Sequence, residues 1–167
     1  MTTTQKFLKQ LQDEAIITRK MLSIVPDDKF DWQPHPKSMT IRALTTHIAE
    51  VPGWVTIALN TTALDLANNP YGAPVLNTGA ELLAFFEEKQ ASGCASLQQA
   101  TEEDLAVLWT MSYGEQVIST LPREEVIRSS ISQIIHHRAQ LGVFLRLLDV
   151  PIPGSYGPSA DEMNGGM

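Results

Sequence analysis

Two histidines in separate segments are the residues of this chain whose type and spacing best suit chemistry. His47 lies in the helical pattern of residues 44–50, and His137 lies in that of residues 133–141. Each falls at the border of an apolar stripe, the surface that a helix turns towards its neighbours. Helical bundles build metal sites from histidines on facing helices. If these two helices face each other, the two imidazoles converge near one end of the core.

The spacing around His137 determines how complete such a metal site would be. A helix presents two ligands on one face at positions i and i+4, and the residue four positions before His137 is Gln133 rather than a histidine. Successive helical residues lie about 100° apart, so His136 cannot point at the same centre as His137. Spacing therefore gives the hypothesis of a divalent metal held by His47 and His137, with Gln133 as a weak oxygen ligand or replaced by water.

The ligand types limit the metal and leave an alternative open. Imidazole suits zinc, nickel, iron or copper, and a catalytic zinc site has about three protein ligands and an open position. Two histidines and a neutral amide make a poorer zinc site than three histidines. Alternatively, His47 and His137 are packed histidines whose ring nitrogens are satisfied by hydrogen bonds.

Four helices are predicted to carry these residues. Apolar positions that step by three, four and seven are typical of helices that bury one face. Pro52 is expected to kink the second helix, and Pro122 is expected at the first position of the fourth. The predicted helices cover about residues 3–24, 38–59, 78–100 and 122–149.

The order of these helices indicates the fold class. One short and two longer connections favour an all-α fold, an antiparallel four-helix bundle with long loops. Residues 107–120 alternate loosely and could form a short hairpin or an extended connection. We expect one bundle domain over residues 1–150 and an irregular C-terminal tail over residues 151–167, packed on the bundle or mobile.

The composition excludes several classes of protein. Of the 167 residues, 43% are hydrophobic, which is enough for a core, while the net charge of −7 argues against a nucleic-acid footprint. Cys94 is the only cysteine, so a disulfide framework and a CxxC zinc site are excluded. There is no signal-peptide pattern, and no apolar run approaches the ~20 residues of a membrane span. We expect a cytoplasmic protein that binds neither membranes nor nucleic acids.

Several motifs, taken in their order along the chain, resemble the DinB/YfiT-like superfamily. They span nearly the whole sequence, and their combination is more specific than any one of them. The matching segments are Trp32-x-Pro34-His35-Pro36-Lys37-Ser38, residues 44–49 with Pro52-x-Trp54, residues 136–146, and Pro151-x-Pro153-Gly154-x-Tyr156-Gly157-Pro158 with the following residues 159–162.

The resemblance implies a four-helix bundle, often dimeric, with three histidines that bind nickel or zinc. The first falls on His47 and the third on His137, while the second falls on position 133, where this chain has glutamine. Relatives include transferases and isomerases that use low-molecular-weight thiols activated by the metal, and many others have no known activity.

Together these inferences predict a homodimeric DinB-like protein with a degenerate metal site at His47, Gln133 and His137. The predicted activity is metal-dependent transfer or hydrolysis of a small-molecule substrate, with a low-molecular-weight thiol, which the ion deprotonates, as the cosubstrate. The alternative is a metal-free bundle that binds a small molecule or a protein partner in the same pocket, without catalysis.

Overall fold

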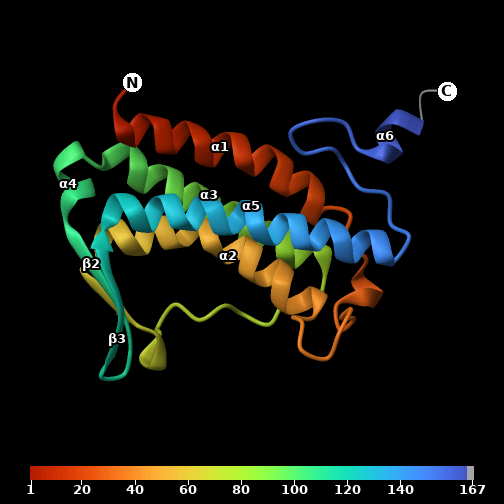
Figure 1. The fold of residues 1–167 in the computed structure, drawn as a ribbon, viewed down its shortest axis with the longest axis horizontal. Helices are drawn as coiled ribbons and strands as arrows, with labels where there is room; N and C mark the ends of the chain where they lie inside the picture. The colour runs from red at the N-terminus through yellow and green to blue at the C-terminus, as the bar shows by residue number, and fades with distance from the viewer. Residues whose placement is uncertain (165–167) are drawn as a thin grey trace.

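Four long helices lie side by side and form the body of the computed structural model, which describes residues 1–164 (Figure 1). The long helices are α1 (Thr3–Leu22), α2 (Ile41–Asn60), α3 (Gly79–Gln99) and α5 (Arg123–Leu147). The short elements are the helices α4 (Glu102–Ala106) and α6 (Ala160–Asn164), the 3-10 helices η1 (Asp27–Lys29) and η2 (Leu66–Asn68), and the strands β1 (Ala63–Asp65), β2 (Leu108–Tyr113) and β3 (Gln116–Pro122). The predicted bundle of four helices is confirmed.

Threonine side chains begin three of the four long helices. Thr2, Thr40 and Thr78 each accept a hydrogen bond from a backbone N–H in the first turn, which satisfies a donor that has no partner within the helix. The fourth long helix begins without such a cap. The sequence predicted Pro122 as the first residue of this helix, whereas in the structure it is the N-cap of α5, one position earlier. Glu124 and Glu125 lie in the first turn, near the positive end of the helix dipole.

The directions of the helices differ from the antiparallel arrangement that the sequence predicted. At the beginning of α2, Arg42 donates a hydrogen bond to the side chain of Asn77, just before α3, and further along Thr56 and Ser92 share one of 2.8 Å. The two helices therefore run in the same direction, while α1 and α5 run the opposite way (Figure 1). The reason is the long connection after α2, which returns along the bundle before α3 begins (Figure 1).

A small three-stranded sheet covers one end of the bundle. The sequence predicted an all-α fold, and this sheet shows that the fold is not strictly all-α. The strand order is β1-β2-β3, with β1 parallel and β3 antiparallel to β2. Residues 107–120, left open as a hairpin or an extended connection, contain the hairpin, because Gly114 adopts the positive φ of 57° that its turn requires. Trp109 is buried with Leu64 and Val126, which anchors the sheet to the helices.

The second helix is the most deeply packed of the four. It continues through Pro52, where a kink was predicted. Gly93 of α3 lies against it so closely that an added Cβ would be 2.5 Å from the Pro52 carbonyl oxygen. This close contact fixes the position of α2 along α3. It therefore also fixes which side chains of α2 lie opposite those of α5.

Residues 151–164 of the C-terminal tail fold back on the bundle at the end opposite the sheet, and residues 165–167 lie outside the described part of the chain (Figure 1). Arg146 and Asp161 form an ion pair of 2.5 Å, and the Tyr156 hydroxyl donates a hydrogen bond of 2.7 Å to Glu14 of α1. Across residues 1–164, no helix has the length and apolar character needed to cross a membrane. The division into residues 1–150 and 151–167, the homodimer and the cytoplasmic location stay predictions.

Candidate functional site

Two imidazoles from different helices meet on one side of the bundle. His47 projects from α2 and His137 from α5, and their ring centroids lie 4.8 Å apart with an interplanar angle of 77°. Both rings are partly exposed; 27% of the His47 side chain is accessible. The structure therefore brings together the two histidines that the sequence analysis placed at one centre.

Each of the two histidines is held by an acceptor three residues further along its own helix. The Nδ1 atom of His47 lies 2.6 Å from Oε1 of Glu50, and that of His137 lies 2.8 Å from Oε1 of Gln140. An oxygen acceptor keeps the proton on Nδ1 and leaves the lone pair on Nε2. This is how the surroundings of metal-binding histidines fix the tautomer and the ring orientation.

The electrostatic environment favours neutral imidazole at His137. Burial lowers the pKa of His137, and the neighbouring rings of His47 and His136 lower it further, against the opposing effect of the hydrogen bond with Gln140. Neutral imidazole is the form that binds a metal, because a protonated ring has no free lone pair.

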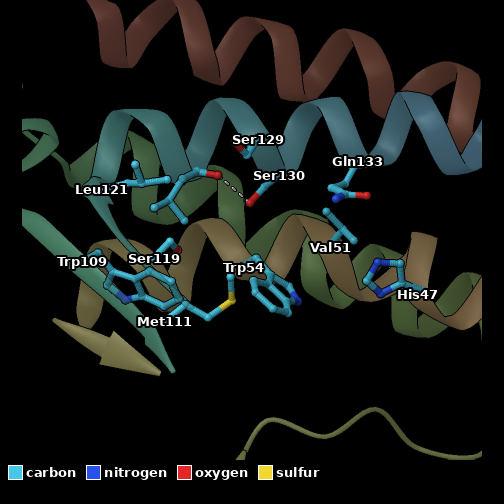
Figure 2. Close-up of a pocket in the computed structure, with 11 residues that line it drawn as sticks. His47, Val51, Trp54, Trp109, Met111, Ser119, Leu121, Ser129, Ser130 and Gln133 are labelled. Atoms are coloured by element: carbon cyan, nitrogen blue, oxygen red, sulfur yellow. Dashed lines mark hydrogen bonds between the residues drawn. The ribbon is translucent and has the colours of Figure 1, made fainter. Parts of the chain in front are cut away.

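Gln133 and His136 differ in how they relate to this pair. Gln133 lies one turn before His137 and lines a pocket together with His47 (Figure 2). His136 is exposed, and its ring centroid is 4.9 Å from that of His137, so the His137 ring contacts both other imidazoles. Within residues 1–164, no group of three His, Cys, Asp or Glu side chains is arranged to hold an ion.

The donor set is two imidazoles and one amide, and its geometry can be compared with that of a bound ion. An ion at about 2.1 Å from one nitrogen of each ring holds the ring centroids roughly 5 Å apart at tetrahedral angles. The observed separation of 4.8 Å is near this value, and it is also an ordinary spacing for two rings packed edge to face. Imidazole is a ligand that suits a divalent transition ion, and Gln133 can add at most a neutral oxygen.

A pocket of about 240 Å³ opens beside His47, between α2, α5 and the inner face of the hairpin (Figure 2). The sequence analysis missed its hairpin wall, because the hairpin itself was uncertain. It did not assign Glu50 and Gln140 as acceptors for the two imidazoles, although the repeated pattern of a histidine followed three residues later by Glu or Gln could have indicated them. The pocket is lined by His47, Val51, Trp54, Trp109, Met111, Ser119, Leu121, Val126, Ser129, Ser130 and Gln133.

Cys94 lies outside this site. It is half-buried, Gln90 donates a hydrogen bond to its Sγ at 3.3 Å, and burial raises the pKa of its thiol. A raised pKa keeps the side chain as a thiol rather than a nucleophilic thiolate. Cys94 is therefore a packing residue.

Comparisons with known proteins agree with this fold. The chain is 24% identical over 161 residues to the uncharacterised protein YrdA of Bacillus subtilis, which covers 96% of this chain and 92% of YrdA. A DinB-like protein from Bacillus cereus has a TM-score of 0.71 at 20% identity, with 91% of this chain and 97% of that chain covered.

Two solved structures with a described activity share the fold. YfiT from Bacillus subtilis, described as a probable metal-dependent hydrolase with an unusual four-helix bundle topology, has a TM-score of 0.65 at 15% identity, with 89% of each chain covered. A mycothiol-dependent maleylpyruvate isomerase has a TM-score of 0.61 at 16% identity, covering 85% of this chain and 64% of that one. The model of the DinB family matches residues 1–166, and this chain belongs to the DinB family.

Proposed function

We propose that this chain is a metal-dependent enzyme in which His47 and His137 together bind one divalent transition ion, nickel or zinc. The observation that carries the proposal is that both rings, 4.8 Å apart, have their Nδ1 atoms engaged by oxygen acceptors. With Nδ1 engaged, each ring has Nε2 as its remaining nitrogen for an ion, which is how metal-binding histidines are held. Gln133 takes the third position and orients a water molecule or a substrate group.

The reaction that we propose is transfer or hydrolysis with a low-molecular-weight thiol as cosubstrate. A bound ion would supply a Lewis acid, and a thiol that coordinates such an ion is deprotonated outright. YfiT, described as a probable metal-dependent hydrolase, and the mycothiol-dependent isomerase support this class of chemistry. The residues of this chain would position the partners: Glu50 and Gln140 orient the imidazoles, and the adjoining pocket binds the substrate away from water.

The amide at position 133 favours a second candidate, a metal-free protein that binds a small molecule in the same pocket. Because Gln133 is neutral, the site lacks the third imidazole that a tight zinc site uses. In that case Glu50 and Gln140 would satisfy the histidines as packed side chains.

Calorimetric titration of nickel and zinc into the metal-free protein separates the two candidates. We expect one ion per chain in the wild type and an affinity at least about tenfold higher in Gln133→His, because a third imidazole joins the donor set. Val143→His, which adds a histidine to an exposed position of the same helix with no other histidine three or four residues away, is the matched control and should leave the affinity unchanged. Absence of binding in both the wild type and Gln133→His would contradict the metal site and favour the metal-free candidate.

A further inference from the structure

The pocket beside His47 has walls that limit what can occupy it. Val51 and Trp54 come from α2, one and two turns beyond His47, and Met111 and Leu121 come from the two strands of the hairpin (Figure 2). Its lining residues include no Asp, Glu, Lys or Arg, and His47 is the one ionisable side chain among them. The pocket is therefore an apolar recess, and its single titratable group, His47, lies at the end next to His137.

This lining selects against charged groups. In the metal-free protein, a carboxylate or phosphate entering the pocket would lose its hydration without meeting a Lys or Arg side chain in the lining, which is costly in an apolar environment. The Trp54 ring and the Met111 thioether instead offer polarisable surfaces, and sulfur and aromatic rings pack favourably against other aromatic rings. The occupant that these contacts favour is uncharged and flat.

The volume sets the size of the occupant. An apolar cavity of about 150 Å³ binds benzene, and this pocket measures about 240 Å³. One six-membered ring with a short substituent fits that space with room to spare, whereas a group of three fused rings does not.

A few polar atoms remain free to hold the substituent. The Ser130 hydroxyl donates a hydrogen bond to the Val126 carbonyl at 2.9 Å, shown as the dashed line in Figure 2. Among the lining residues drawn in Figure 2, no hydrogen bond is marked at the hydroxyls of Ser119 and Ser129. A hydroxyl or carbonyl on the bound group can therefore pair with either serine.

We propose that this pocket binds an uncharged single-ring aromatic group of the substrate and excludes its carboxylated counterpart. The assignment of this group to a substrate rests on the proposed function, but the binding itself needs no metal ion. The substrate class that follows is an uncharged aromatic compound whose reacting bond lies towards His47.

The test compares two probes that share a ring and differ in charge. Benzyl alcohol and benzoate are titrated into the protein in the presence of EDTA, and the indole N–H signals of Trp54 and Trp109 are followed by NMR. We expect benzyl alcohol to shift the Trp54 signal in a saturable manner, with benzoate at least about tenfold weaker. Equal affinities for the two probes, or no saturable shift with benzyl alcohol, would overturn the proposal.

Two variants locate the binding and keep the test decisive. Ser129→Phe fills the pocket and should abolish the shift, whereas Ser132→Phe, at an exposed position of the same helix, should not. Should Ser129→Phe fail to fold, Leu121→Lys serves instead: it places a cation in the lining at a residue that is 40% exposed, and should reverse the preference towards benzoate. Unchanged selectivity in Leu121→Lys would contradict the assignment.

Because EDTA removes metal ions, this outcome is separate from that of the metal titrations. If the titrations show no metal binding but benzyl alcohol still binds, the proposed function alone is refuted. Metal binding without probe selectivity would refute the substrate class alone.

Discussion

Replacement of Arg138 by alanine should destabilise the fold more than any other loss of an ion pair in this chain. Arg138 and Glu14 form a pair of 2.7 Å between α5 and α1, with 2% and 8% of their side chains exposed. Arg138 also donates hydrogen bonds to Thr18 at 3.0 Å and to the Tyr156 hydroxyl at 3.1 Å. Glu14 Oε2 receives no well-aligned hydrogen bond from the described residues, so its attraction to the guanidinium is mainly electrostatic.

The magnitude follows from the burial of the carboxylate. Without Arg138, Glu14 would remain buried with only the Tyr156 hydroxyl, at 2.7 Å, as its side-chain partner. Removal of one partner of a buried pair costs about 3–5 kcal/mol. At about 2–4 °C per kcal/mol for a chain of this size, the midpoint of thermal unfolding should fall by roughly 6–20 °C.

Urea unfolding and calorimetry measure this cost, with Arg128→Ala as the control. Arg128 lies on the same helix and pairs with Glu125, but 59% of its side chain is exposed, so its loss should cost at most about 1 kcal/mol. The double variant Glu14→Leu/Arg138→Met should recover part of the lost stability, because apolar side chains remove the stranded charge. If Arg138→Ala costs no more than Arg128→Ala, the reasoning from burial is refuted.

Three further predictions concern the helix contact, the tail and the imidazole acceptors. Gly93→Ala should cost about 1–3 kcal/mol in urea unfolding although alanine favours helix, because the new Cβ would lie 2.5 Å from the Pro52 carbonyl oxygen; an unchanged midpoint would show that α2 and α3 can separate freely. The hydrogen bond from Arg146, the backbone hydrogen bond from Ile152 and the charge of Arg146 lower the pKa of Asp161 to about 2, so the contribution of Asp161 to stability is present above the ordinary carboxyl pKa and is lost as the pH falls towards 2. Arg146→Ala should move the Asp161 midpoint upward in an NMR titration, and a midpoint that stays near 2 would rule out the ion pair as the cause. Glu50→Ala should weaken metal binding about 10–100-fold by releasing the imidazole that it orients, and an equal affinity in a calorimetric titration would assign Glu50 no part in the site.

Local signals predicted the helices and the facing histidines well. The helices predicted to begin near residues 38 and 78 are capped by Thr40 and Thr78, because a hydroxyl before an apolar period is a local feature. The border positions of His47 and His137 on their stripes were equally readable, and the structure brings the two rings together. Whether they bind an ion stays a prediction.

The remaining features depend on contacts between distant segments. The parallel direction of α2 and α3 is set by the connection between them, whose residues have no period that would show its path. The hairpin lies against the bundle through the burial of Trp109, a tertiary contact that no local pattern specifies. The pocket needs both the hairpin and the antiparallel pair of α2 and α5, so it could not be predicted before either was known.

Metal binding by single and double histidine variants tests the shared site most directly. The nickel content per chain is measured by elemental analysis after equilibrium dialysis of the wild type, His47→Ala, His137→Ala and the double variant. A single ion held by both rings predicts near-stoichiometric nickel in the wild type, a large loss in each single variant, and no further loss in the double variant. Retention of nickel in either single variant, or losses that simply add, would contradict binding of one ion by His47 and His137 together.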